Sequence, residues 1–300
     1  MKAVVRVRVP ATSGNMGPGF DTLGVALRLY NRVETRLLDT SKVRLVGTRG
    51  SEPPSGAVKM IAAATRAFFR KIGIAARGVE VSVRGDVPTA RGLGSSVTVR
   101  LGVLVGLNRL LGRPLRESDL LDLVAALEGH PDNAAPALLG GMTVAGTAEG
   151  RVVAWRIRVP RKLKFVAAIP DYEVETRAAR ALLPARISFA DAAHNANRAA
   201  LVVAAMRAGD YVRLGAFLED RLHQPFRAKL VPQLFPALEA ARRAGAIGGW
   251  LSGSGSTVMA LTLDSPQTVG RAMARAFRRG GARCRILVLE SDAEGARIER

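Results

Sequence analysis

The sequence is poor in the residues on which several classes of protein depend. Its 300 residues include one cysteine, Cys284, which excludes an internal disulfide and is expected to be a small buried residue in the last strand. Tryptophan, tyrosine and phenylalanine make up 5% of the chain, which leaves few side chains for stacking on nucleic-acid bases. No apolar run is long enough to span a bilayer and no signal peptide is visible, so we expect a cytoplasmic protein that does not bind membranes.

Positive charge, by contrast, is abundant. Lysine and arginine number 45 against 25 acidic residues, and the formal net charge is +20. The arginines are scattered along the chain, with no basic tail and no run of five like charges. Such a field attracts small anions but does not define a partner. A basic nucleic-acid-binding protein therefore stays open as an alternative, although the scarcity of aromatic residues argues against it.

The order of apolar patterns predicts an α+β protein, because strand-like and helix-like segments alternate with hairpin-length turns. We expect strands over 4–9, 23–30, 33–38, 43–46, 79–84, 142–145, 152–159, 164–169, 247–251, 258–263 and 285–289. We expect helices over 57–72, from 95, from an N-cap at Ser118 to Glu128, over 176–183, 189–208, 211–222 and 233–244, and from 266. Loops are expected over 10–20 and 47–56. A boundary near the 142–159 hairpin divides the chain into domains over 1–150 and 151–300.

The stretch VPTARGLGSSVTV, residues 87–99, predicts a phosphate-binding loop. It joins a strand to a helix through a turn that contains Gly92 and Gly94, followed by Ser95 and Ser96. Glycine permits a close approach of the backbone, and the first amides of a helix have no partner within it. Neither GxxxxGK followed by serine or threonine nor GxGxxG after a strand occurs. An ordinary tight turn with a serine N-cap is the alternative interpretation.

Two other glycine-rich segments, PATSGNMGPGFD and GGWLSGSGSTV, lie before and after this loop, and EGHPDNAAPALLGG lies between the loop and the second of them. In this order the segments resemble the superfamily of galactokinase, homoserine kinase, mevalonate kinase and phosphomevalonate kinase (the GHMP kinases), and within it the homoserine kinases most closely. The resemblance runs from Pro10 to about Leu261. It implies a ribosomal-protein-S5-like first domain that binds ATP, a ferredoxin-like second domain that completes the substrate site, and a homodimer. Ser256 stands where the family's last motif has proline.

The resemblance also implies how ATP and Mg²⁺ are bound. The residues that it assigns to the nucleotide are Pro88, Arg91, Gly92, Leu93, Gly94, Ser95 and Ser96. It assigns the metal to Ser96 and Glu128, and Mg²⁺ prefers oxygen ligands of this kind. An acid at a helix C-terminus is mildly unfavourable because of the helix dipole, which favours a functional role for Glu128 over that of a solvated surface acid.

The substrate site implied by the resemblance is that of an amino acid. The residues that it assigns to the substrate are Asn15, Asp21, His130, Arg180 and Arg227. Asp21 would pair with the ammonium group, and the planar guanidinium of arginine suits a carboxylate better than lysine does. From the residues alone, a structural histidine and two surface arginines are the alternatives.

The catalytic residues implied are Asn133, Thr176 and Arg180. Related kinases use an aspartate base near the position of Asn133 and a lysine in the first motif, which has no lysine here. An amide cannot accept a proton as a general base, so we expect direct in-line transfer without a base. The implied reaction is ATP-dependent phosphorylation of the side-chain hydroxyl of L-homoserine to O-phospho-L-homoserine, a step of threonine biosynthesis. A GHMP kinase acting on shikimate or mevalonate is the alternative.

Overall fold

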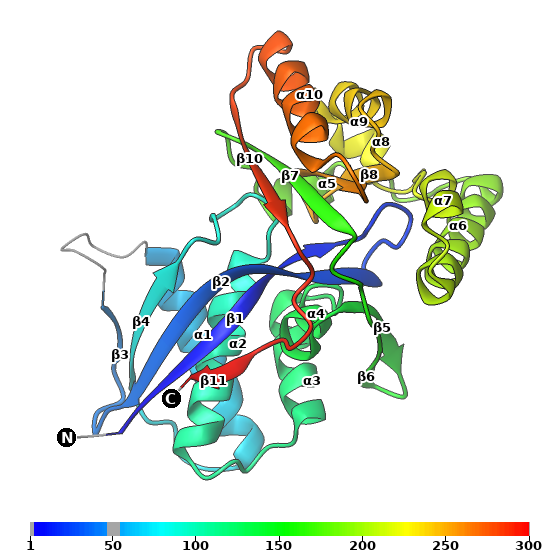
Figure 1. Cartoon of the computed structure of the whole chain (residues 1–300). Coiled ribbons are helices and arrows are strands. Elements are labelled where there is room, and N and C mark those ends of the chain that lie inside the picture. The colour runs from blue at the N-terminus through cyan, green and yellow to red at the C-terminus, as the bar shows by residue number, and fades with distance from the viewer. Residues whose placement is uncertain (1–2, 47–54, 300) are drawn as a thin grey trace.

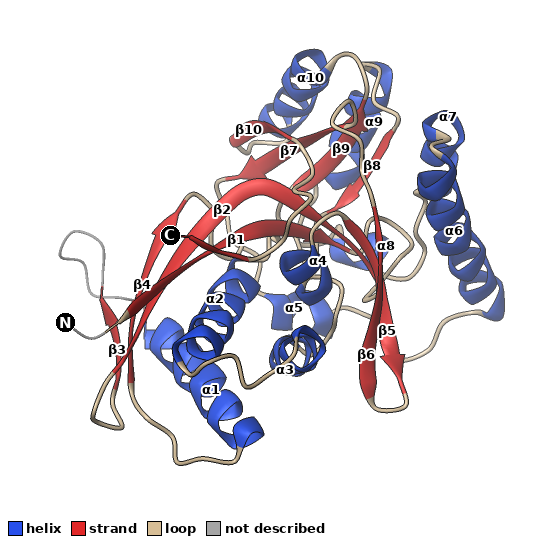
Figure 2. Cartoon of the chain, turned by 60° about the horizontal axis from the view of Figure 1, so that its bottom comes forward, coloured by secondary structure: helices blue, strands red, loops and turns tan. Residues whose placement is uncertain are grey.

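The protein has two β-sheets with helices packed against them, as Figures 1 and 2 show for the computed structural model. This model describes residues 3–46 and 55–299, so most of the turn expected over 47–56 lies outside the described residues. The mixture of helix and sheet confirms the predicted α+β class. Among the described residues, no helix is both long enough and apolar enough to cross a membrane.

The first sheet contains most strands of the N-terminal half. Its strands are β1 (Val4–Gly14), β2 (Leu23–Leu37), β3 (Val43–Val46), β4 (Val79–Gly85), β5 (Met142–Ala148), β6 (Arg151–Ile157) and β11 (Arg297–Glu299). The order is β11-β1-β2-β4-β3, and β5 pairs with both β2 and β6. The helices packed against this sheet are α1 (Ser55–Ile72), α2 (Ser95–Leu110), α3 (Glu117–Glu128) and α4 (Ala134–Leu139). Figure 2 shows these helices together on one side of the sheet.

The second sheet has the topology expected for a ferredoxin-like domain. Its strands are β7 (Lys164–Pro170), β8 (Gly248–Leu251), β9 (Val258–Thr262) and β10 (Cys284–Leu289), all paired antiparallel in the order β10-β7-β9-β8. If the four strands are numbered 1 to 4 in chain order, their order in the sheet is 4-1-3-2. Helices lie in the connection between the first two strands and in the connection between the last two, which is the βαββαβ pattern. Helices α9 (Leu234–Arg243) and α10 (Pro266–Arg279) pack against it. Val269, Met273 and Phe277 form the buried stripe of α10, at the spacing of an amphipathic helix.

A helical segment joins β7 to α9. It consists of α5 (Thr176–Ala181), α6 (Phe189–Ala208), α7 (Tyr211–Leu214), a 3₁₀ turn (Gly215–Phe217) and α8 (Gln224–Arg227). In Figure 1, α6 and α7 lie to one side of the two sheets, and Val202, Met206 and Leu214 belong to a core cluster that also contains residues of β2 and β7. The helix expected over 211–222 is wrong, because it ends at Leu214. The buried carboxylate of Asp220 accepts hydrogen bonds from the amides of Leu222, His223 and Gln224, and so offers the backbone an alternative to the helix.

Three other elements have boundaries that differ from those expected from the sequence. Strand β1 continues to Gly14 through residues expected in a loop, with a register shift at Pro10 where the missing amide is tolerated. Strand β2 is continuous from 23 to 37, instead of two strands. Ser118 is not an N-cap: the helix starts at Glu117, and Asp119 accepts from the amide of Arg116 at 3.1 Å.

The chain end returns to the first sheet. Strand β11 was not expected from the sequence, and it pairs antiparallel with β1, so that Val7 lies opposite Ile298. Strand β6, which starts at Arg151, also belongs to this sheet. Two strands of the second half of the chain, β6 and β11, are thus hydrogen-bonded into the first sheet. The division into domains at residue 150 stays a prediction.

Candidate active site

A cavity of about 440 Å³ gathers most of the residues predicted to function. Those that line it are Asn15, Asp21, Arg91, Gly92, Gly94, Ser95, Ser96, Glu128, His130, Asn133, Thr176, Arg180 and Arg227. They come from the first motif, from α2 and the loop before it, from the C-terminal end of α3 and its turn, from α5 and from α8. Segments more than 200 residues apart in the sequence thus meet at one cavity.

The three glycine-rich segments are bonded directly to one another. The amide of Thr12 donates to the Leu93 carbonyl at 3.2 Å, and the amide of Gly253 donates to the Gly14 carbonyl at 3.2 Å. Ser252 completes the contact, because its hydroxyl donates to the Gly92 carbonyl at 2.6 Å. The main chains of the three segments therefore approach one another closely, which explains why small residues recur in all three.

Gly92 and Gly94 are required by the shape of the loop. Both have a positive φ, 74° and 68°, which disfavours any side chain. A Cβ on Gly92 would lie 2.1 Å from the Ser252 carbonyl oxygen, and one on Gly94 would lie 2.1 Å from Oγ1 of Thr12. The loop can adopt this path only with glycine at both positions.

Gly94 is also the N-cap of α2, so Ser95 is the first residue of the helix and does not cap it. The serine N-cap interpretation is therefore wrong. Ser95 and Ser96 occupy the first turn, where the main-chain amides have no partner within the helix, and both residues line the cavity. This end of a 16-residue helix carries the positive pole of its dipole, which suits an anion.

Ser96 and Glu128 come from different helices and are hydrogen-bonded to each other. The Ser96 hydroxyl donates to Oε2 of Glu128 at 2.8 Å, and Arg100 donates to Oε1 at 2.6 Å. The Glu128 side chain is only 9% exposed. Arg100 was not found from the sequence, although it lies one helical turn after Ser96 and therefore on the same face of α2.

Asp21 and Arg180 form an ion pair across the cavity. Nη1 of Arg180 donates to Oδ2 at 3.0 Å and Nη2 donates to Oδ1 at 2.9 Å. These hydrogen bonds raise the pKa of Arg180 further above its ordinary value. Asn15 supports the arrangement, because its Oδ1 accepts from the amide of Asp21 at 3.0 Å.

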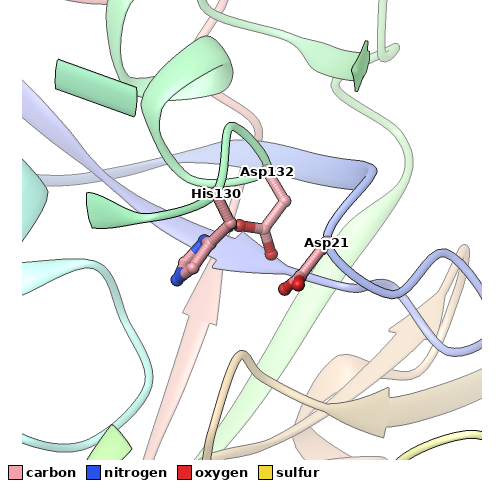
Figure 3. A group of neighbouring side chains, drawn as sticks. All are labelled: Asp21, His130 and Asp132. Carbon is pink, nitrogen blue, oxygen red and sulfur yellow. Dashed lines mark hydrogen bonds and ion pairs between the residues drawn. The ribbon is translucent and has the colours of Figure 1, made fainter. Parts of the chain in front are cut away.

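Asp21, His130 and Asp132 form an acidic group in which one ligand atom of each residue lies within 4.8 Å of the others (Figure 3). Asp132 is 1% exposed and its carboxylate lies 2.5 Å from Nδ1 of His130. Burial alone would lower the pKa of His130, but the hydrogen bond and the charges of Asp132 and Asp21 outweigh it and raise the pKa. Asp132 is not among the site residues predicted from the sequence, although it lies within the HPDN motif.

Both polar atoms of the Asn133 side chain are engaged. Its Oδ1 accepts from the Thr12 hydroxyl at 2.7 Å, and its Nδ2 donates to Oδ1 of Asp132 at 3.1 Å. This arrangement fixes the amide orientation and leaves one hydrogen of the NH₂ group for a ligand. Gly14 must be glycine beside it, because a Cβ there would lie 2.1 Å from Oδ2 of Asp132.

Arg227 brings to the cavity a buried positive charge without a carboxylate in direct contact among the described residues. Its side chain is almost fully buried, and Nη1 donates to the Gly253 carbonyl at 2.9 Å. Among the described residues, no carboxylate lies within 4.0 Å of this guanidinium, and its Nε has no hydrogen-bond partner. Burial, together with the charge of Arg180, lowers the pKa of Arg227 to about 10.

Three of the predicted nucleotide-binding residues do not present a free side chain to the cavity. Pro88 does not line the cavity and instead lies in a separate depression with Pro170 and Cys284. The Leu93 side chain is fully buried, so only its main chain can face a ligand. Arg91 lines the cavity, but its guanidinium donates to the Pro170 carbonyl at 3.0 Å and to the Asp171 carbonyl at 3.2 Å. The nucleotide-binding roles of all three stay predictions.

Comparison with known proteins places this geometry in a family. The family model for the N-terminal domain of GHMP kinases matches residues 59–141, and the model for their C-terminal domain matches residues 202–279. The homoserine kinase of Moorella thermoacetica is 40% identical over 290 residues, which cover 97% of this chain and 98% of that protein. The chain belongs to the homoserine kinases of the GHMP kinase family. The homoserine kinase of Clostridium beijerinckii is likewise 40% identical over 296 residues and 98% of both chains.

Solved structures agree with the family and its fold. The crystal structure of homoserine kinase from Cytophaga hutchinsonii superposes with a TM-score of 0.89 at 29% identity, covering 100% of this chain and 98% of that one. A crystal structure of mevalonate kinase superposes with a TM-score of 0.70 at 14% identity, which shows the shared GHMP fold.

Proposed function

We propose that the protein transfers the γ-phosphoryl group of ATP to the side-chain hydroxyl of L-homoserine and so forms O-phospho-L-homoserine. The observation that carries this proposal is the distribution of charge in one cavity. Free helix amides at Ser95 and Ser96 offer an anion site, whereas two carboxylates and an unpaired guanidinium lie farther along the same cavity. The curated relatives of this family are named for homoserine.

The acidic group and Arg227 match the two charges of an amino acid. An ammonium group offers three hydrogens, and the group formed by Asp21, His130 and Asp132 offers acceptors within reach of one another. The carboxylate would bind to Arg227, whose buried charge lacks an acidic partner among the described residues. A buried charge without a partner is costly, and a ligand of opposite charge removes that cost.

The chemistry requires orientation of the acceptor and stabilisation of charge more than it requires a base. Asn133 holds the hydroxyl with its remaining N–H, because its other polar groups are fixed by Thr12 and Asp132. The hydroxyl proton moves directly to the transferred phosphoryl group as the new O–P bond forms and the bond to the β-phosphate bridging oxygen breaks. Thr176, whose hydroxyl lies 3.3 Å from that of Ser254, and Arg180 contact the transferred group.

The oxygens of Ser96 and Glu128 fit a magnesium ion. They lie 2.8 Å apart at the cavity wall, beside the first turn of α2, and one or two protein oxygens plus phosphate oxygens are the ligands that Mg²⁺ usually accepts. Ser96 and Glu128 would hold the ion, which would neutralise negative charge on the phosphates when bound.

One assay tests the proposed activity. ADP release is measured with Mg-ATP and each of L-homoserine, shikimate, mevalonate and L-threonine at matched concentrations. We expect release with homoserine to exceed that with each of the other three by at least about 100-fold, since only homoserine combines a zwitterion with a primary hydroxyl at the right distance. Greater release with shikimate or mevalonate would overturn the proposal and leave the family assignment intact.

We also propose a cytoplasmic homodimer, as the family resemblance implies. Sedimentation equilibrium at several protein concentrations measures the subunit count, and a mass equal to that of one 31.8 kDa chain throughout would contradict the dimer.

A further inference from the structure

The side chains of His223 and the half-buried Phe20 contact Arg227 and do not line the cavity. His223 is fully buried and its ring stacks on that of Phe20, with the ring centroids 5.3 Å apart and 29° between the planes. The guanidinium carbons of Arg227 and Arg180 lie 5.2 Å and 5.4 Å from the centroid of the same Phe20 ring. One aromatic ring therefore contacts both arginines of the proposed substrate site.

The hydrogen bonds of His223 determine where its single proton lies. Nε2 is 2.9 Å from the Gly17 carbonyl oxygen and 3.5 Å from Oδ2 of Asp220, and both of these atoms only accept. Nε2 must therefore carry the hydrogen. Nδ1 is left with its lone pair, and it lies 3.4 Å from Nη1 of Arg227, which only donates.

Protonation of His223 would oppose this arrangement. A second N–H, on Nδ1, would point at the Arg227 guanidinium and place two buried cations in contact. The groups that face the imidazole are the Gly17 carbonyl, Asp220, Arg227 and, farther away, Asp21. Burial lowers the pKa of His223, and Arg227 lowers it further against the opposing charge of Asp220.

We propose that neutral His223 is a positioning residue, which holds Arg227 through its Nδ1 acceptor and its stack with Phe20 so that the guanidinium meets the carboxylate of the substrate. The inference rests on the proposed function, since it concerns the carboxylate subsite of the same cavity. It concerns a residue that does not line the cavity.

The readout is a selectivity ratio, defined as kcat/KM for L-homoserine divided by kcat/KM for L-homoserine amide. The amide keeps the ammonium group and the hydroxyl but lacks the negative charge that Arg227 would bind. Loss of general stability or of ATP binding changes both values together and leaves the ratio unchanged. A displaced Arg227 lowers the ratio.

Two substitutions distinguish the roles of the two ring nitrogens of His223. In His223→Asn the side-chain oxygen can take the place of Nδ1 and accept from Arg227, whereas in His223→Gln the amide reaches the place of Nε2 and leaves Arg227 without its acceptor. We expect the ratio to fall about tenfold or more in His223→Gln and to stay within about threefold in His223→Asn, because a hydrogen bond to a charged group is worth about that much. His194→Gln is the matched control, since His194 lies on α6 outside the cavity. Equal ratios in His223→Gln and the unsubstituted protein would overturn the inference.

The unsubstituted protein supplies a test that does not depend on the folding of a variant. The ratio is expected to be constant between the ordinary histidine pKa of about 6.5 and about pH 7, where the amide still carries its ammonium group. It is expected to fall at more acidic pH, because the pKa of His223 is lowered and the neutral form is the competent one. In His223→Asn the fall is expected to disappear. A ratio that rises as the pH falls would overturn the inference, and so would an unchanged fall in His223→Asn.

Arg227→Met separates failure of this inference from failure of the proposed function. If Arg227→Met lowers the ratio and His223→Gln does not, only the role of His223 is wrong. If neither substitution changes the ratio, the carboxylate does not bind at Arg227 and the proposed substrate geometry fails with it.

Discussion

Asp21 and Arg180 are bound to each other in the cavity through two parallel hydrogen bonds of 2.9 and 3.0 Å. Asp21 is proposed to bind the ammonium group of the substrate, and Arg180 to contact the transferred phosphoryl group. A substrate with an ammonium group gives Asp21 a second partner of opposite charge, whereas an alcohol that carries only a carboxylate is repelled by Asp21. The proposed arrangement therefore disfavours acids without an ammonium group.

Asp21→Asn should raise KM for L-homoserine about 10- to 100-fold, because the ammonium group loses a charged acceptor and Arg180 loses its partner. KM for ATP should change less than about twofold. Steady-state kinetics with each substrate varied in turn measures both values. Asp264→Asn, at an exposed position outside the cavity, is the control, and an equal effect of the two substitutions would contradict the role of Asp21.

Glu128→Gln should raise the Mg²⁺ concentration that gives half-maximal activity by about tenfold or more, since a neutral amide is a poorer ligand for Mg²⁺ than a carboxylate. Initial rates over a range of Mg²⁺ at saturating homoserine measure this concentration. Glu117→Gln at the other end of α3 serves as the control, because it lies outside the cavity. An unchanged Mg²⁺ dependence in Glu128→Gln would exclude Glu128 as a ligand.

Gly94→Ala should raise KM for ATP about tenfold or more, because the added Cβ would lie 2.1 Å from Oγ1 of Thr12 and would shift the loop. Gly112→Ala is a matched control: its φ is 80°, and a Cβ there would meet no atom within 4 Å. Both substitutions should destabilise the fold by about 1 kcal/mol through the positive φ. Thermal unfolding measures the loss of stability, and steady-state kinetics measures KM for ATP. Equal KM values for ATP in Gly94→Ala and Gly112→Ala would contradict the phosphate-binding role of the loop.

Asn133→Asp should lower kcat at least about tenfold near neutral pH. The new carboxylate would lie about where Nδ2 now donates to Asp132, at 3.1 Å, and would replace a hydrogen bond with repulsion between buried charges. Activity should recover partly at lower pH, as one of the two carboxylates takes up a proton. The pH profile of kcat checks this, with Asn197→Asp on the exposed face of α6 as the control. A rate that is unchanged or higher at all pH values would show that Asn133 does not act through its amide.

Local pattern accounts for the α+β class, most strands and the order of the three glycine-rich segments. The pattern of apolar residues is a short-range property, and it predicts the strands of the second sheet and the helices packed on it, whereas the ferredoxin-like arrangement was implied by the family resemblance. The helix expected over 211–222 is wrong. The observed helix ends at Leu214 and is followed by a 3₁₀ turn, and Asp220 then fixes the next turn by binding three backbone amides. Strand β11 was missed because a three-residue strand carries too little pattern, and it forms only against β1.

The predicted site residues came from a family resemblance, and the tertiary structure decided which of them share a cavity. It brought Asp21 to Arg180 across 159 positions and left Pro88 outside. It also showed Arg100, Asp132 and His223, whose importance depends on partners distant in the sequence. A single chain's sequence determines side-chain chemistry and local backbone preference. Burial, pairing of charges and the proton position on a histidine depend on which segments pack together, and only the folded chain decides that.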